Sequence, residues 1–172
     1  LQYHEVKLNI TFAAADQLAA SPPTAAPSAA LYVDYIYLDT DERRRFAQVS
    51  HEYLIEQVQF TGEESHQTAN NTFRLNFNHP VKELVWVTRL DADGTGAFDY
   101  SDGQTPAGNN TKNAKLTLNG HDRFSERDGA YFNYVQPFQH HTSTPGVGVN
   151  VYSFALKPED HQPSGTCNMS RI

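Results

Sequence analysis

The chain has 172 residues, a formal net charge of −7 and a charged fraction of only 19%. This length suits one domain with a substantial buried core. The low charge and the 12% aromatic content exclude a wholly disordered chain. The net negative charge argues against a surface for nucleic acid or anionic lipid, because both need clustered lysine and arginine. No apolar run approaches the roughly 20 residues that span a bilayer.

Apolar and polar residues alternate along much of the chain, which is the pattern of strands with one buried face. Several of these runs are also rich in β-branched and aromatic residues, which favour strands. The sequence predicts seven strands, in the segments Val6–Phe12, Leu31–Leu38, Tyr53–Phe60, Phe73–Phe77, Val81–Leu90, Leu116–Leu118 and Val147–Leu156.

Helices are predicted only between strands. One begins near Thr40 as its cap, with Phe46 and Val49 facing inward, and a second runs near Asp128–Val135. The two longest connections, Ala13–Ala30 and Asp91–Lys112, are rich in proline and glycine and are predicted to be loops. The pattern indicates an all-β protein, an antiparallel β-sandwich of the jelly-roll type with short helices in its loops.

Two of the predicted strands are apolar on both faces. Leu84, Val85, Trp86 and Val87 follow one another without a polar residue, and the Val147–Leu156 segment carries large apolar residues on both sides. Such strands need cover on both sides. A second layer, another domain or another subunit would provide it, and so would a local helix or loop.

Six sequence motifs, spread over most of the chain, are each weak alone, but their combination and order are specific to one protein family. They are Tyr32–Asp39, Asp41–Phe46, His51–Gln59, Asn78–Val87, Tyr152–Pro158 and Pro163–Asn168. In this order they resemble the major capsid protein of the nucleocytoplasmic large DNA viruses.

The resemblance implies a structural virion protein with no catalytic role and no cofactor. It implies two successive jelly rolls in each subunit and a homotrimer of nearly hexagonal outline, which tiles an icosahedral shell with neighbouring capsomers and minor capsid proteins. The shell would overlie an internal lipid membrane without direct contact with nucleic acid. The implied location is the virion capsid, assembled in the host cytoplasm.

Residues 1–172 resemble the second jelly roll and the stretch that leads into it. We expect a single jelly-roll domain that is incomplete at its C-terminal end, with the N-terminal jelly roll absent from this chain. The first residue is Leu1 and the sole methionine is Met169, so we expect a part of a longer protein.

The expected interface between jelly rolls or subunits is the double-faced run Leu84, Val85, Trp86 and Val87, with Trp86 buried. Asparagines in glycosylation motifs occur at Asn70, Asn109 and Asn168, and also at Asn9 within a predicted strand, where a glycan fits least.

Other reactive residue types carry weaker patterns. His121, His140, His141 and His161 lack the recurrent spacing of a metal site, and we expect structural histidines. Cys167 has no nucleophile motif around it. The oxygen-rich run Asp91–Asp102 resembles a calcium loop but lacks its final glutamate and flanking helices, so a plain turn is favoured.

Two rival functions remain open from the sequence. The first is a carbohydrate-binding β-sandwich module, which would present exposed aromatic residues as a platform. The second is a minor or penton capsid protein with a related jelly roll.

Overall fold

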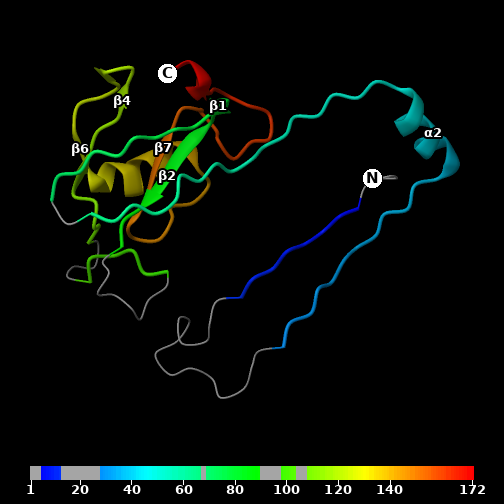
Figure 1. Cartoon of the computed structure of the whole chain (residues 1–172), viewed down its shortest axis with the longest axis horizontal. Coiled ribbons are helices and arrows are strands. Elements are labelled where there is room, and N and C mark those ends of the chain that lie inside the picture. Colours follow the sequence, from blue (N-terminus) through cyan, green and yellow to red (C-terminus); the bar gives the residue numbers. More distant parts are fainter. Residues whose placement is uncertain (1–4, 13–27, 67–68, 90–97, 104–107) are drawn as a thin grey trace. The chain divides into compact units, whose positions relative to one another are not determined.

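The computed structural model describes residues 5–12, 28–66, 69–89, 98–103 and 108–172 (Figure 1). The chain divides into two units. One comprises Leu1–Thr24 with Asn76–Ile172, and the other comprises Ala25–Leu75. Every strand of the described residues belongs to the first unit, whereas the second unit contains helix α2 (Thr40–Gln48).

The strands of the first unit form four antiparallel ladders that are nested along the sequence. At the centre β4 pairs with β5, and β3 with β6, β2 with β7 and β1 with β8 follow outward. This nesting is that of one long hairpin interrupted by loops. The strands are β1 (Pro80–Val81), β2 (Glu83–Val87), β3 (Asn113–Ala114), β4 (Thr117–Leu118), β5 (His121–Asp122), β6 (Arg127–Asp128), β7 (Val149–Ser153) and β8 (Cys167–Asn168).

The tip of this long hairpin is the turn between β4 and β5. Asn119 and Gly120 have φ angles of 50° and 78°, so both lie in the left-handed region. A two-residue hairpin with both central residues in this region is the turn that Asn-Gly favours, because its twist matches that of the strands. The local sequence therefore sets the point at which the chain reverses.

A helical segment follows β6. The π-helical η1 (Tyr131–Val135) continues directly into α3 (Gln136–His140). The predicted helix near Asp128–Val135 is therefore confirmed in part, but it begins later and extends to His140. Pro137 is tolerated at the start of α3, where a missing backbone N–H costs least. Figure 1 shows this ribbon beside the β2–β7 ladder, and both η1 and α3 contact β7.

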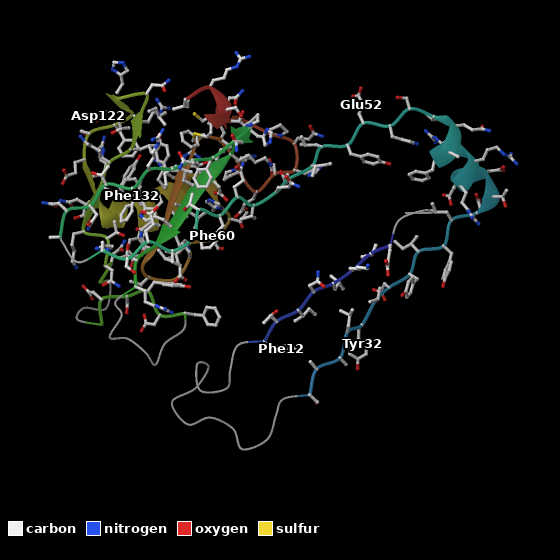
Figure 2. All side chains as sticks on the ribbon, in the orientation of Figure 1. Phe12, Tyr32, Glu52, Phe60, Asp122 and Phe132 are labelled. Carbon is white, nitrogen blue, oxygen red and sulfur yellow. The ribbon has the colours of Figure 1, made fainter. Side chains whose placement is uncertain are left out.

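The core of the first unit is built around Phe132, whose side chain is fully buried (Figure 2). Its ring packs edge-on against Trp86 of β2, with 5.1 Å between ring centroids, and against Phe124 at 5.7 Å. Phe124 also contacts Tyr152 of β7 at 4.9 Å. Leu84 is buried beside them. The ring of Phe132 from the helix, together with Phe124, thus joins both strands of the β2–β7 ladder.

The N-cap of helix α2 lies one residue before the predicted cap. Asp39, and not Thr40, is the N-cap: its Oδ1 accepts from the backbone N–H of Glu42 at 2.8 Å, while Glu42 Oε2 accepts from the Asp39 N–H at 3.2 Å. This reciprocal pair is a capping box built with aspartate. The prediction that Phe46 and Val49 face inward is wrong, because both are more than half exposed.

Four of the seven predicted strands form no ladder in the described chain. These segments are extended but belong to no strand ladder of the described residues, and Figure 2 labels Phe12 and Tyr32 in two of them, which are 67% and 93% exposed. Alternation determines which side chains share a face, but it does not supply the neighbouring strand to which the backbone bonds. The corrected segments are Val6–Phe12, Leu31–Leu38, Tyr53–Phe60 and Phe73–Phe77.

The other three predicted strands are confirmed with shorter bounds. Val81–Leu90 contains β2, Val147–Leu156 contains β7, and Leu116–Leu118 overlaps β4. None of the helices in the part of the chain that the structure describes has the length and apolar character needed to cross a membrane.

Replacing the central ring tests this core. Phe132→Ala removes a fully buried aromatic side chain and leaves a cavity, so we expect the free energy of unfolding to fall by about 3–5 kcal/mol. Urea denaturation of the full-length protein measures it. Phe138→Ala is the matched control, because Phe138 lies on the same helical segment and is 83% exposed. Equal loss in both variants would contradict this description of the core.

Candidate assembly surface

The longest ladder of the structure joins β2 and β7 over five residue pairs. Val85 lies opposite Val151, and Val87 lies opposite Val149. Because side chains of directly opposed residues share a face, these four valines form one face of the ladder. Leu84 and Trp86 lie on the other face.

The two faces of β2 have different surroundings. Leu84 is 8% exposed, and Trp86 is half-buried against Phe132, so both contact the chain's own core. Val85 and Val87 are 57% and 44% exposed. The structure therefore separates the four predicted interface residues into two that face inward and two that face solvent. The expected burial of Trp86 is partial and involves the chain's own helix.

Buried amide side chains hold β7 in place through hydrogen bonds. Asn150 is fully buried and its Oδ1 accepts from Asn109 Nδ2 at 2.6 Å. Asn133 Nδ2 donates to the carbonyl of Val149 at 2.7 Å, and Gln136 Oε1 accepts from the backbone N–H of Ser153 at 3.0 Å. These bonds satisfy polar groups that have no access to water, and they fix the position of the strand. The sequence carried no clear signal for this network.

Asn109 serves this network and is only 8% exposed. Its Nδ2, the atom to which a glycan would attach, also lies 3.3 Å from the carbonyl of Gly129. The folded chain thus does not present this motif to solvent. The other three candidate glycosylation residues, Asn9, Asn70 and Asn168, are exposed.

The histidines do not converge on a shared centre. His121 and His161 are exposed, and His140 contacts the carbonyl of Leu156 through Nδ1 at 3.0 Å. His141 lies between two carboxylates, those of Glu83 and Glu159. In the described ranges, no group of three or more His, Cys, Asp or Glu residues is arranged to hold a metal ion.

In the calcium-like run, Asp91–Ala97 lies outside the described residues, and residues 98–102 lie within them. Asp99 accepts from the backbone N–H of Ser101 at 3.0 Å, and hydrogen bonds from Ser101 lower the pKa of Asp99. Asp102 Oδ2 lies 2.9 Å from Lys112 Nζ. Cys167 lies in β8 opposite Val81 and is half-buried.

Comparison with known proteins places this arrangement among viral capsids. Residues 42–172 match the family described as large eukaryotic DNA virus major capsid protein. The chain is 53% identical to the major capsid protein of Pyramimonas orientalis virus, covering 100% of this chain and 46% of that protein. It is 45% identical to the major capsid protein of Paramecium bursaria Chlorella virus 1, covering 100% of this chain and 47% of that protein.

A solved structure gives the same answer for the fold. A chain of the quasi-atomic model of the PBCV-1 virus capsid matches with a TM-score of 0.66 and 44% identity, over 80% of this chain and 40% of that one. The predicted fold class, an all-β antiparallel jelly roll, is confirmed by this match.

The ladder, its helix and these similarities define a capsid protein of the jelly-roll class. More specifically, the chain belongs to the family of large eukaryotic DNA virus major capsid proteins. It spans about half the length of the curated relatives it matches.

The amide network can be tested by removing its central side chain. Asn150→Ala removes the nearer of the two acceptors of the buried Asn109 amide, and we expect the free energy of unfolding to fall by about 1–3 kcal/mol. Gln139→Ala is the control, since this amide is exposed on α3 and should change stability by less than about 0.5 kcal/mol. Urea midpoints of the full-length variants give both values. An unchanged midpoint for Asn150→Ala would mean that the network does not stabilise β7.

Proposed function

We propose that this chain is part of a structural virion protein whose work is assembly and not catalysis. The observation that carries the proposal is the exposed valine pair, Val85 and Val87, on a β2 strand whose other face already packs on the core. A β-branched apolar face left in water favours association with another apolar surface. Membership of a major capsid protein family supports a neighbouring capsid subunit or jelly roll as that surface.

The whole protein would then be a homotrimer of double jelly rolls. Its trimers would tile an icosahedral shell of a double-stranded DNA virus with neighbouring capsomers and minor capsid proteins, above an internal lipid membrane and without direct contact with nucleic acid. Assembly in the host cytoplasm belongs to the same proposal. The net charge of −7 is compatible with a shell that does not touch the genome.

We base the proposed domain assignment on predicted strands that have no ladder partner among the described residues. Residues 1–172 correspond to the second jelly roll and the stretch leading into it, in a chain that covers 46% of one relative. Val6–Phe12 alternates strongly and Leu31–Leu38 is rich in β-branched and aromatic residues, yet neither segment has a ladder partner among the described residues. Strands supplied by the remainder of the protein would complete their pairing and cover their apolar side chains.

The carbohydrate-binding alternative would rely on exposed aromatic residues. Tyr32, Tyr35 and Tyr37 are each at least 75% exposed, and the Tyr35 and Tyr37 rings stack at 6.3 Å. They lie, however, in a segment with the β-branched and aromatic composition of a strand, and the match to the capsid family covers residues 42–172. The capsid role therefore accounts for more of the chain.

A charged residue introduced on the exposed valine face of β2 tests the proposed role in assembly. Val85→Asp places a carboxylate on an exposed position that assembly would desolvate, so we expect the full-length protein to fold but to lose its oligomer. Native mass spectrometry measures the oligomer, and circular dichroism verifies the fold. Thr144→Asp is the control, because it adds the same charge at an exposed residue outside the ladder. A stable Val85→Asp oligomer would contradict the proposed interface.

A further inference from the structure

The two edges of the β2–β7 ladder differ in their hydrogen bonding. On the β7 edge, Asn133 Nδ2 donates to the carbonyl of Val149 at 2.7 Å. On the same edge, the backbone N–H of Ser153 donates to Gln136 Oε1 at 3.0 Å. Side-chain amides of the helical segment therefore occupy the place where a further strand would bond to β7.

The backbone groups on the β2 edge have no such partners. In an antiparallel ladder, opposed residues alternate between pairs that bond to each other and pairs whose N–H and C=O groups point outward. Val149 and Ser153 bond to the helical segment, so they belong to the outward kind. The same holds for the β2 residues opposite them, Val87 and Glu83, and for Val85 at the alternate position between these two. Among the described residues, no hydrogen bond reaches these outward groups of β2, and β7 is the only strand that pairs with it.

An open edge with exposed apolar side chains favours the addition of another strand. Natural edge strands are commonly protected by lysine, proline or a bulge, because a row of free backbone groups pairs readily with another chain. β2 contains neither lysine nor proline, and its register with β7 is continuous. A strand added at this edge satisfies the backbone groups and covers the exposed Val85 and Val87 at the same time.

The solvent-facing residues of β2 have a regular order of charge. Alternation along the strand and the two residues that follow it places on one face Glu83, Val85, Val87 and Arg89. Thr88 lies on the other face, where its hydroxyl is 3.0 Å from that of Thr111. The exposed face therefore has a negative end, two valines and a positive end.

Both charged ends of this face are accessible. Arg89 is exposed, and no carboxylate of the described residues is in ion-pair contact with it. The side chain of Glu83 is 29% exposed, and its Oε2 lies 2.8 Å from His141 Nε2 but makes no hydrogen bond among the described residues. Each charge can therefore take a partner from outside the chain.

We propose that the open edge of β2 pairs with β2 of a second copy of this protein, antiparallel and across a two-fold axis that passes between the two Trp86 residues. Antiparallel pairing inverts the order of charges, so Glu83 of each copy lies opposite Arg89 of the other. Val85 of each copy lies opposite Val87 of the other. The outward backbone groups then bond to each other, and opposite charges close both ends of the apolar patch.

Backbone pairing and charge together select this register. A shift of one residue would place outward-directed backbone groups opposite groups that already bond to β7. A shift of two residues would place a charge opposite a valine at each end of the patch.

The inference rests on the proposed function, because it names the partner of the exposed valines. A two-fold contact uses the same patch on both copies, whereas a three-fold axis cannot bring a patch onto itself. The pairing of β2 therefore joins subunits of neighbouring trimers and not the subunits within one trimer.

Disulfide cross-linking of the full-length protein tests the register. In a mixture of Val85→Cys and Val87→Cys proteins, the introduced thiols of two copies lie opposite each other, with Cα atoms roughly 5.5 Å apart, which is within the range of a disulfide. Under a mild oxidant we expect a covalent dimer on a non-reducing gel. Each variant alone is a matched control, because its thiols are diagonal neighbours about 7–8 Å apart and should stay at the wild-type background.

Charge reversal in the same mixture tests the ion pairs. Arg89→Glu in both proteins places like charges opposite each other at both ends of the patch, and we expect the initial cross-linking rate to fall about tenfold. Adding Glu83→Arg restores opposite charges and should recover most of the rate. Arg43→Glu reverses an exposed charge on α2 and should leave the rate unchanged.

Three results would overturn the pairing: no dimer in the mixture, equal dimer in the single variants, or a rate that does not respond to Arg89→Glu. The Arg89 variant and the cysteine mixture remain decisive even if Glu83→Arg fails to fold. If the pairing fails while Val85→Asp still dissociates the oligomer, the proposed function stands and a different apolar surface covers the valines. If Val85→Asp leaves the oligomer intact, the proposed interface itself is contradicted.

Discussion

The contact on which the structure of the first unit depends is the packing of Phe132 against the β2–β7 ladder. The helix supplies one buried ring, which packs against Trp86 of β2 and against Phe124, and Phe124 in turn contacts Tyr152 of β7. This contact occupies one face of β2. On the opposite face of β2, Val85 and Val87 are exposed, whereas their β7 neighbour Val151 is buried, and the exposed pair makes this strand a candidate for association.

Much of the ladder could be predicted from the sequence, and the reason is local. β-Branched and aromatic residues marked the segments that contain β2 and β7. The same signal failed for Leu31–Leu38, because residue composition favours an extended strand but does not supply the neighbouring strand that completes it. The helix cap shifted from Thr40 to Asp39 because both residue types cap well and only geometry distinguishes them.

The polar part of the structure was less accessible to sequence reasoning. Asn109 drew notice only as a glycosylation motif, whereas in the fold it is buried against Asn150 of β7. His141 follows another histidine and lacks the spacing of a metal site. Its two carboxylate contacts are Glu83, 58 positions earlier, and Glu159. Such partners come together only through the nested pairing of the chain, so spacing along the sequence does not reveal them.

The most direct measurement for the central claim is an electron cryo-microscopy structure of the assembled full-length protein, at a resolution that shows side chains. We expect apolar residues of another jelly roll or subunit to cover Val85 and Val87, while Trp86 stays against Phe132 of its own chain. If both valines face water in the assembled shell, the proposed surface is not an interface and association must depend on other parts of the protein.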